Sequence, residues 1–280
     1  MILIVDSGGT KSDWALCAGG TVRKTFSADG LTPVHQSVDE LQNVIRTQVL
    51  PQVGASGVRK IYFYGSGCME HNAGQMRQAL SEIFFSAATV FVADDLLGAA
   101  RALFGTDEGV ACILGTGSNS CLYDGRSVAA HIPPLGFILG DEGSGAVLGR
   151  NFLNSIFKDP QCSALQQAFL SSTGLTLPEI IQKTYRAPLP SRFLASIVPF
   201  LHANLENPWV KSLVIENFKS FIRQNVIHYA RPDLPIGCVG SLAYHFESQL
   251  RRAADELGIM VGAVLKNPLD KLITYHQNDQ

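Results

Sequence analysis

One pattern occurs twice in this sequence, and it constrains the fold more than any other feature. The stretch Ile2–Phe26 contains an apolar strand, a glycine turn, a second strand, another glycine turn and a third strand. The stretch Gly109–His131 has the same order about 107 residues later. Helix and strand patterns alternate after each stretch. The economical interpretation is a duplicated α/β unit, which predicts two similar domains.

The chain has 280 residues, enough for two domains. We expect a first domain over residues 1–105 and a second domain over residues 106–280. The second domain carries an insertion over about residues 143–230, which is rich in helical patterns. The apolar faces of the inserted helices would form either a core or the contact surface of a homodimer.

The composition excludes several classes of function. The net charge is -2 and no basic run occurs, which argues against nucleic acid as a partner. Charges or glycines interrupt every apolar stretch before the roughly 20 residues that a membrane span requires. The N-terminal stretch "MILIVDSGG" lacks the basic start and cleavage site of an export signal, so we expect a cytoplasmic protein with no membrane partner. The six cysteines are scattered singly, which favours buried reduced thiols over metal ligands.

The first hairpin turn, within "DSGGTKS", has residue types suited to phosphate binding. It is not a P-loop, because Val5 and Thr10 stand where that motif requires glycines. In a hairpin turn, Gly8 and Gly9 can take left-handed conformations that expose backbone N–H groups to an anion. Asp6 at the strand end can hold a hydrated divalent cation. The alternative is an ordinary glycine turn with a solvated aspartate.

Three further glycine-marked stretches follow predicted strands: "GTGSN" at 115–119, "GDEG" at 140–143 and "GCVGS" at 237–241. Two matching hairpin turns, one from each repeat, could face each other across a cleft and hold a polyphosphate from both sides. The last stretch closes a strand before a helix, where glycine lets a flat ligand such as adenine approach the backbone. Each stretch alone is more often structural, but together and in this order they indicate a nucleotide-binding protein.

These motifs resemble those of the acetate kinase, sugar kinase, Hsp70 and actin superfamily. Within it, the sequence is similar to the BadF/BadG/BcrA/BcrD-type ATPase group that includes N-acetylglucosamine kinase, along essentially the whole chain. The resemblance implies two ribonuclease-H-like (actin-like ATPase) domains of the α/β class, with ATP and Mg²⁺ in the cleft between them. It also implies a kinase that phosphorylates a hydroxyl of a small sugar, with N-acetylglucosamine or a related amino sugar as the expected acceptor.

The resemblance further implies roles for individual residues. The first and second phosphate motifs and the adenosine motif would contact the nucleotide through Asp6, Gly8, Gly9, Thr10, Lys11, Gly115, Thr116, Gly117, Gly240 and Ser241. Asp6 would be the residue nearest the metal. Asn119 and Asp141 would bind sugar hydroxyls.

A kinase of this type also needs a base that orients and deprotonates the acceptor hydroxyl. The amino-sugar kinases have this aspartate in a D-A-A-G pattern at a strand end, and "VADDLLGAAR" fits that pattern here. Counting back from Gly98 selects Asp95 as the base. Its neighbour Asp94 is then available as the helix cap.

Two positions depart from the amino-sugar kinases: Val34 stands where they have Asn, and Phe137 where they have Trp. Losing an amide there would change recognition of a sugar hydroxyl or acetamido group.

Two other functions are open. The same group includes ATPases that activate dehydratase-type or reductase-type partners through an iron–sulfur cluster, for which Cys112 and Cys121 would be the ligands. The third alternative is a sugar or nucleotide sensor without catalysis.

Overall fold

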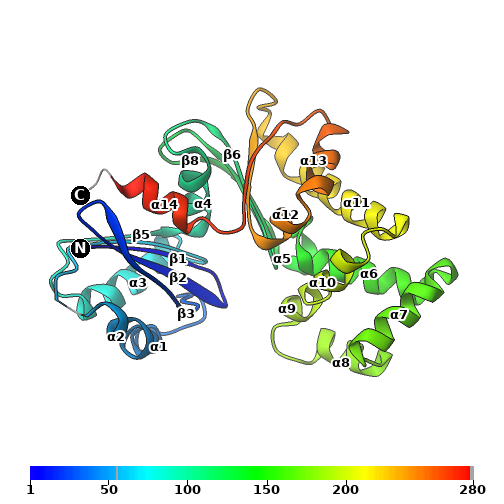
Figure 1. The fold of residues 1–280 in the computed structure, drawn as a ribbon, viewed down its shortest axis with the longest axis horizontal. Coiled ribbons are helices and arrows are strands. Elements are labelled where there is room, and N and C mark those ends of the chain that lie inside the picture. The colour runs from blue at the N-terminus through cyan, green and yellow to red at the C-terminus, as the bar shows by residue number, and fades with distance from the viewer. Residues whose placement is uncertain (55, 278–280) are drawn as a thin grey trace. The chain divides into compact units, whose positions relative to one another are not determined.

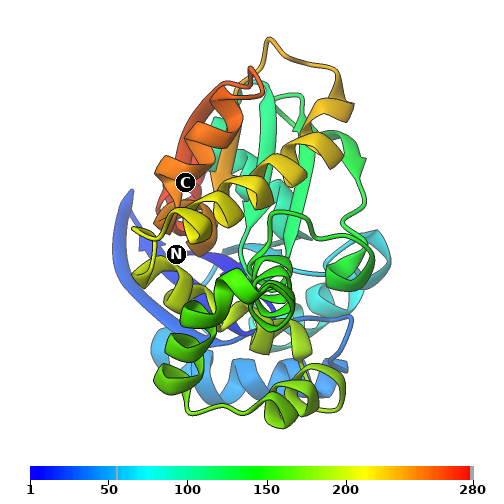
Figure 2. The ribbon, with the colours of Figure 1, turned by 90° about the vertical axis from the view of Figure 1, so that its right-hand side faces the viewer.

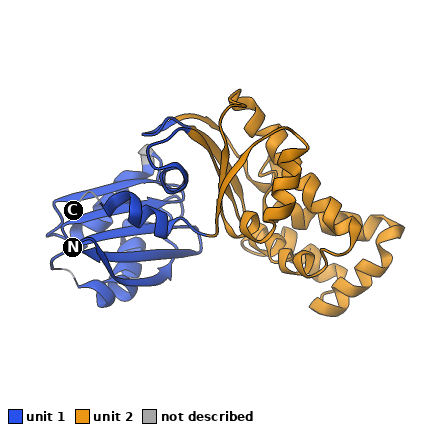
Figure 3. Cartoon of the chain, turned by 45° about the horizontal axis from the view of Figure 1, so that its top comes forward, with its two compact units in different colours: residues 1–108, 123–128, 267–280 blue, residues 109–122, 129–266 orange. Residues whose placement is uncertain are grey.

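The chain folds into two compact units, and the computed structural model describes residues 1–54 and 56–277 (Figure 1). Unit 1 contains residues 1–108, 123–128 and 267–280, and unit 2 contains residues 109–122 and 129–266 (Figure 3). The division at residues 108–109 lies close to the boundary expected at 105–106. The C-terminal segment differs from the expectation, because it belongs to unit 1 and not to the second domain.

Unit 1 contains a five-stranded mixed sheet in the order β3-β2-β1-β4-β5. Its strands are β1 (Ile2–Ser7), β2 (Lys11–Ala18), β3 (Thr21–Asp29), β4 (Lys60–Gly65) and β5 (Thr89–Asp94). The first three strands are antiparallel, whereas β1, β4 and β5 run parallel. The register aligns Ser7 with Gly65 and Gly65 with Asp94. The carboxyl ends of the three parallel strands therefore meet at one edge, where α/β proteins place ligands.

Helices cover both faces of this sheet. The helices α1 (Val38–Val44), α2 (Leu50–Val53) and α3 (Glu70–Ile83) share one buried core with the alternate residues Leu3, Val5 and Phe63. A capping box opens α1: Ser37 accepts the Glu40 N–H, and the Glu40 carboxylate accepts the Ser37 N–H. A π-helical turn, Ile45–Val49, follows α1 directly.

The other face of the sheet carries α4 (Asp95–Phe104) and α14 (Leu269–His276). The buried His276 ties α14 to the sheet, because its Nε2 lies 2.8 Å from the hydroxyl of Tyr64 and its ring stacks on Tyr62 at 3.7 Å. Arg101 of α4 donates to the same Tyr64 hydroxyl at 2.8 Å. These contacts explain why the C-terminal helix belongs to unit 1.

Unit 2 repeats the sheet of unit 1. Its strands are β6 (Gly109–Leu114), β7 (Ser118–Tyr123), β8 (Val128–Ile132), β9 (Ile236–Val239) and β10 (Val261–Leu265). Their order, read from the other edge, is β8-β7-β6-β9-β10. This is the order of unit 1 with each strand replaced by its counterpart, as a duplicated unit predicts.

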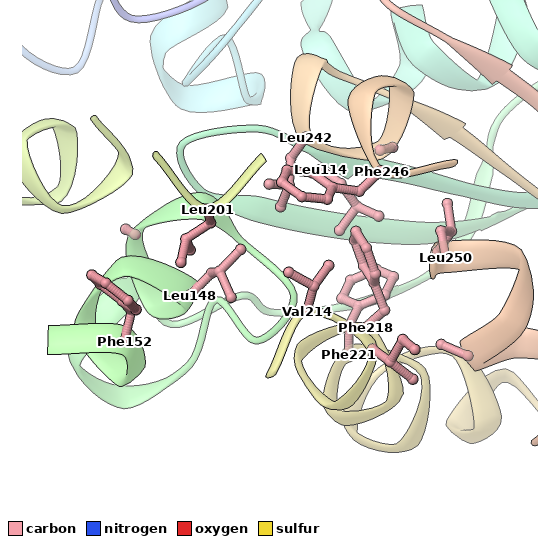
Figure 4. Packing of buried hydrophobic residues seen from close by; sticks show 14 of the residues in the cluster. Leu114, Leu148, Phe152, Leu201, Val214, Phe218, Phe221, Leu242, Phe246 and Leu250 are labelled. Carbon is pink, nitrogen blue, oxygen red and sulfur yellow. The ribbon is translucent and has the colours of Figure 1, made fainter. Parts of the chain in front are cut away.

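Most of the helices of unit 2 lie between β8 and β9, where the insertion was expected, and Figure 2 shows them in green to yellow. The insertion contains α5 (Gly136–Leu139), α6 (Gly145–Lys158), α7 (Ser163–Thr173), α8 (Leu177–Tyr185), α9 (Pro190–Ala195), α10 (Val198–Ala203) and α11 (Pro208–Gln224). After β9 follow α12 (Ser241–His245) and α13 (Glu247–Asp255). Phe218 and Phe221 of α11 pack with Leu114, Leu242 and Phe246 in one core, so the inserted helices complete the domain (Figure 4).

All six cysteines are buried and form no disulfide, as the sequence predicts. Cys112, Cys121 and Cys238 lie in three strands of the unit 2 sheet and are 0% exposed. No helix among the described residues is both long and apolar enough to cross a membrane.

Candidate active site

Hydrogen bonds within the β1–β2 turn of unit 1, and from the segment after β3, hold this turn in place. Gly8 donates its N–H to the carbonyl of Lys11 at 3.0 Å, which closes the turn. The segment after β3 packs against it, and Gly30 donates to the carbonyl of Thr10 at 3.1 Å. A Cβ on Gly30 would lie 2.5 Å from the carbonyl oxygen of Gly8, so only glycine permits this approach. The turn itself stays exposed, which leaves its outer side open to a ligand.

Lys11 follows this turn, and its side chain is 60% exposed and held by one ion pair. Its Nζ lies 2.8 Å from the Oδ1 of Asp13, and that oxygen also accepts the hydroxyl of Ser27 at 2.7 Å. The β1–β2 register places Asp13 directly across from Asp6. A cationic amine therefore stands beside the glycine turn, positioned by its own strand.

Two carboxyl groups at the sheet edge, those of Asp6 and Asp95, have raised pKa values. Desolvation, with repulsion from Asp95 and Asp13 and against the attraction of Lys11, raises the pKa of Asp6 to about 7. Desolvation and repulsion from Asp94 raise the pKa of Asp95 to about 7. Asp94 caps α4, because its Oδ1 accepts the Leu97 N–H at 2.9 Å. Asp94 is therefore the helix cap, and the Asp95 carboxylate does not serve in that position.

In unit 2, the β6–β7 turn is joined to the start of α6. Gly115 donates to the carbonyl of Gly117 at 3.0 Å within the turn. Gly145 and Ala146 donate their N–H groups to the carbonyls of Gly115 and Thr116 at 2.8 and 3.1 Å. Ser144 caps α6 by accepting the Val147 N–H. The second phosphate motif is thereby fixed by the first turn of a helix.

The β9–α12 junction lies directly against that turn. Gly240 has φ +130°, and a Cβ there would overlap the carbonyl of Leu114 at the end of β6. Its N–H donates a hydrogen bond to the carbonyl of Leu265 at 2.9 Å. This close approach brings the start of α12 beside Gly115, as a nucleoside site at a parallel strand end requires.

The two motifs line one cavity of about 390 Å³. Gly115 and Thr116 contribute from the turn and Ser241 from α12. The remaining walls come from the inserted helices and from the rest of α12 and its end: Gly145, Ala195, Val198, Pro199, His202, Leu242, His245 and Phe246. Its volume lies within the range for small ligands, and its walls are mainly apolar with a few polar groups, as a nucleoside requires.

Asp141, one of the two predicted sugar ligands, is held in a strained conformation beside the same turn. Its φ is +51°, which is uncommon for a non-glycine residue. Desolvation and the charge of Glu142 raise its pKa to about 6, against hydrogen bonds from the N–H groups of Ser118 and Gly136. A Cβ built on Gly117 would lie 3.1 Å from its Oδ2, so the structure brings Asp141 to the second phosphate motif. Strain of this kind is concentrated at functional sites.

The second predicted sugar ligand, Asn119, lies on β7. Its Oδ1 accepts the Ser120 N–H at 2.9 Å and lies 2.8 Å from the Nε2 of His131 on β8. His131 therefore fixes the orientation of the amide, so that the Nδ2 group remains to donate to a ligand.

Comparison with solved structures identifies the family. A protein of Porphyromonas gingivalis, provisionally described as an N-acetylglucosamine kinase, is 46% identical to this chain and superposes with a TM-score of 0.95. The match covers 100% of this chain and 99% of that one. The chain belongs to the N-acetylglucosamine kinase family.

More distant structures share the fold of this kinase. A Chromobacterium violaceum protein of the same provisional description is 20% identical, with a TM-score of 0.75 and 98% of each chain covered. A Streptomyces griseus ROK family glucokinase, in complex with glucose and AMPPNP, is 15% identical with a TM-score of 0.60, covering 99% of this chain and 98% of that one. The predicted two-domain actin-like ATPase fold is confirmed. Neither the family models nor the curated proteins compared with the sequence give a match.

The two departures of this kinase from the amino-sugar pattern have different surroundings. The Val34 side chain is 52% exposed and covers Gly67, where a Cβ would lie 2.5 Å from one of its methyl groups. Phe137 is partly buried against the core of unit 2, and its carbonyl accepts a hydrogen bond from Arg150. Val34 therefore presents an apolar surface to solvent, whereas Phe137 is mainly a packing residue.

Sequence reasoning missed most of the cavity walls of the kinase. His202, at the end of α10, and His245 and Phe246, after the adenosine motif, all line the cavity. His202 lies in no motif and far from any predicted strand end, so nothing in the sequence singles it out. The folding of the insertion back toward β6 places it there.

Asp6 suits Mg²⁺ held largely through water. Mg²⁺ in kinases is bound by one or two carboxylates together with phosphates and waters, and does not need a full protein cage. Within residues 1–54 and 56–277, no group of three or more His, Cys, Asp or Glu residues could hold a metal ion. The half-buried carboxylate of Asp6, at the edge where the glycine turn begins, fits such partial coordination.

Proposed function

We propose that this protein is an ATP-dependent kinase that phosphorylates a hydroxyl of N-acetylglucosamine or a related amino sugar. One observation carries the proposal: the second phosphate turn and the adenosine motif line a single cavity of about 390 Å³ in unit 2. This cavity lies in a chain that is 46% identical, over its full length, to a protein provisionally described as an N-acetylglucosamine kinase.

The nucleoside and the phosphates of the nucleotide are assigned to different motifs, because one is largely apolar and the other is anionic. The cavity takes the nucleoside, with Ser241 at one wall and Gly115 and Thr116 toward the phosphates. Gly240 and Gly117 are the neighbours of these lining residues in the two motifs. In unit 1, Lys11 and the turn Gly8–Thr10 bind the terminal phosphates by charge and by backbone N–H groups. Mg²⁺, when bound, neutralises charge on the transferred phosphoryl group, and Asp6 would hold it.

Asp95 is the proposed catalytic base. Its pKa of about 7 lets it accept a proton from the acceptor hydroxyl near neutral pH. Asp94 supports it by capping α4. On the sugar side, Asp141 and Asn119 bind acceptor hydroxyls, and Val34 replaces an amide contact with an apolar one.

The cysteines disfavour the alternative of an ATPase that activates a dehydratase-type or reductase-type partner. A shared iron–sulfur cluster needs accessible thiolates, but Cys112 and Cys121 are 0% exposed within the unit 2 sheet. The sugar kinase is therefore the function we propose.

A coupled assay of ADP release over a panel of sugars tests the proposal. We expect ADP release to depend on N-acetylglucosamine or a close amino sugar, and to exceed the rate without sugar by at least tenfold. The panel should include glucose, N-acetylmannosamine and glucosamine, which separate the acetamido group from the ring. A rate of ADP release that no sugar changes would refute the kinase function.

A further inference from the structure

Thr32, in the loop after β3, has every backbone hydrogen-bonding group occupied. Its N–H donates to the side-chain oxygen of Gln36 at 2.6 Å. Its carbonyl accepts the N–H groups of His35 and Gln36 at 3.0 and 3.1 Å. The Gln36 amide also donates to the carbonyl of Gly30 at 3.4 Å. The position of Thr32 is therefore fixed before any ligand arrives.

The side-chain hydroxyl of Thr32, unlike its backbone groups, forms no hydrogen bond with the described residues. Its Oγ1 is buried and has no hydrogen-bond partner among the described residues. A buried hydroxyl without a partner is unfavourable, and each such group in a folded protein calls for an explanation. A Cβ built on Gly9 would lie 4.0 Å from this oxygen, whereas a Cβ built on Gly67 would lie 3.7 Å from the methyl group of Thr32. The hydroxyl side of Thr32 is thus the side toward the glycine turn.

The neighbouring contacts fix the backbone just before Thr32. Gly30 packs against the backbone of Gly8 and Thr10, and the Oγ of Ser7 accepts the Leu31 N–H at 2.9 Å. The segment that carries Thr32 is thereby attached through Gly30 and Leu31 to the β1–β2 turn and the end of β1. A ligand bound at this turn is the group that can supply the missing partner.

We propose that Thr32 binds the terminal phosphoryl group of the nucleotide, by donating its hydroxyl hydrogen bond to an oxygen of that group. Phosphate oxygens are strong acceptors, and a hydrogen bond from a hydroxyl to a charged oxygen is among the stronger types. The inference rests on the proposed function only in one respect, that the Gly8–Gly9 turn holds the terminal phosphates. It adds a binding residue outside all four glycine-marked motifs.

Calorimetric titration with Mg²⁺–AMPPNP and with Mg²⁺–ADP tests the inference, because only the first has the terminal phosphoryl group. We expect Thr32→Val, which keeps the shape and removes the hydroxyl, to weaken AMPPNP binding by about 10- to 100-fold. Its affinity for ADP should stay within about threefold of wild type. Thr32→Ser, which keeps the hydroxyl and removes the methyl group, is the matched control and should bind AMPPNP within about threefold of wild type.

Thermal unfolding of the same variants separates ligand binding from a structural role. We expect Thr32→Val without ligand to melt at or above the wild-type Tm, because the substitution removes an unpaired buried hydroxyl. A lower Tm together with equal losses of AMPPNP and ADP affinity would show a structural role and overturn the inference. An unchanged AMPPNP affinity with a raised KM for the sugar would assign the hydroxyl to the acceptor and also overturn it.

The outcomes for this inference and for the proposed function are distinguishable. Wild-type protein that binds AMPPNP but releases no sugar-dependent ADP would refute the kinase and leave the test of Thr32 intact. Sugar-dependent ADP release together with wild-type AMPPNP affinity in Thr32→Val would support the kinase and refute the role of Thr32.

Discussion

The carboxylates of Asp94 and Asp95 are neighbours in the chain but have different surroundings. The Asp94 carboxylate caps α4 by accepting a hydrogen bond from the Leu97 N–H. Asp95 is half-buried, and its pKa is raised to about 7 by desolvation and by the charge of Asp94. The helix cap thus also adjusts the proton affinity of the proposed base.

We predict that Asp95→Asn lowers kcat by about 10²- to 10⁴-fold, the usual contribution of a positioned base. Asp94→Asn is the matched control, because Asn also caps helices well, and its kcat should stay within about tenfold of wild type. Steady-state ADP release with the preferred sugar measures both variants. Equal losses in the two variants would contradict the assignment of the base to Asp95.

The same substitution has an expected effect on stability. The pKa of Asp95 is higher in the folded chain than in the unfolded one, so the folded state binds the proton more tightly. Stability therefore falls as the pH rises from about 4 to about 7, and Asp95→Asn should raise the Tm at pH 8 relative to wild type. Tm values of the two proteins at pH 5 and pH 8 test this, and a gain at pH 5 as large as that at pH 8 would contradict it.

Asp141 leads to a prediction for the sugar. Its carboxylate has a pKa of about 6, and only the ionised form accepts a sugar hydroxyl at both oxygens. The KM for the sugar should therefore rise as the pH falls below about 6, while Asp141→Asn should have a KM roughly 10- to 100-fold higher with little dependence on pH. KM values between pH 5 and pH 8 measure both effects. A wild-type KM that is constant over this range would refute the role of Asp141.

At the scale of elements, the sequence predicts what depends on local patterns. The two hairpins, and the helices and strands that alternate after them, have short-range signals, and the structure confirms them. Two features depend on distant contacts and were not predictable. The C-terminal helix α14 packs on unit 1 through His276, more than 200 residues from its partner Tyr64. The inserted helix α10 folds back to line the cavity with Val198 and His202.

Helix α10 therefore permits a direct test of the cavity. We predict that Val198→Phe weakens adenosine binding more than tenfold, because the larger ring occupies part of the cavity that Val198 lines. Ile181→Phe is the matched control, since Ile181 is an exposed residue of α8 outside the cavity. Calorimetric titration with adenosine compares the two. Adenosine affinity that is unchanged in Val198→Phe would show that the nucleoside binds elsewhere.

At the scale of the whole molecule, the two units have separate cores and each contains one of the two tryptophans. Trp14 is fully buried in the core of unit 1, and Trp209 packs against the core of unit 2, 6.4 Å from the ring of Phe152. All the residues that line the cavity belong to unit 2. A ligand without phosphates should therefore stabilise unit 2 directly.

We predict that adenosine at 100 times its Kd stabilises the transition reported by Trp209 by about 2.7 kcal/mol. The Trp14→Phe variant isolates the fluorescence of Trp209, and Trp209→Phe isolates that of Trp14. The transition reported by Trp14 should shift by less than half as much in urea titrations. Equal shifts in the two variants would show that the units unfold as one cooperative body.

The repeated sheet order leads to a final point about how such a kinase can change. Both sheets keep the same five-strand plan, but the second copy carries a much longer helical insertion between its third and fourth strands, from α5 to α11. Those helices supply Ala195, Val198, Pro199 and His202 to the cavity. With the nucleoside placed in this cavity as proposed, mutations in the inserted helices would alter the choice of nucleobase while both sheets and their glycine turns stay unchanged. Donor preference could then diverge between descendants without loss of the transfer chemistry.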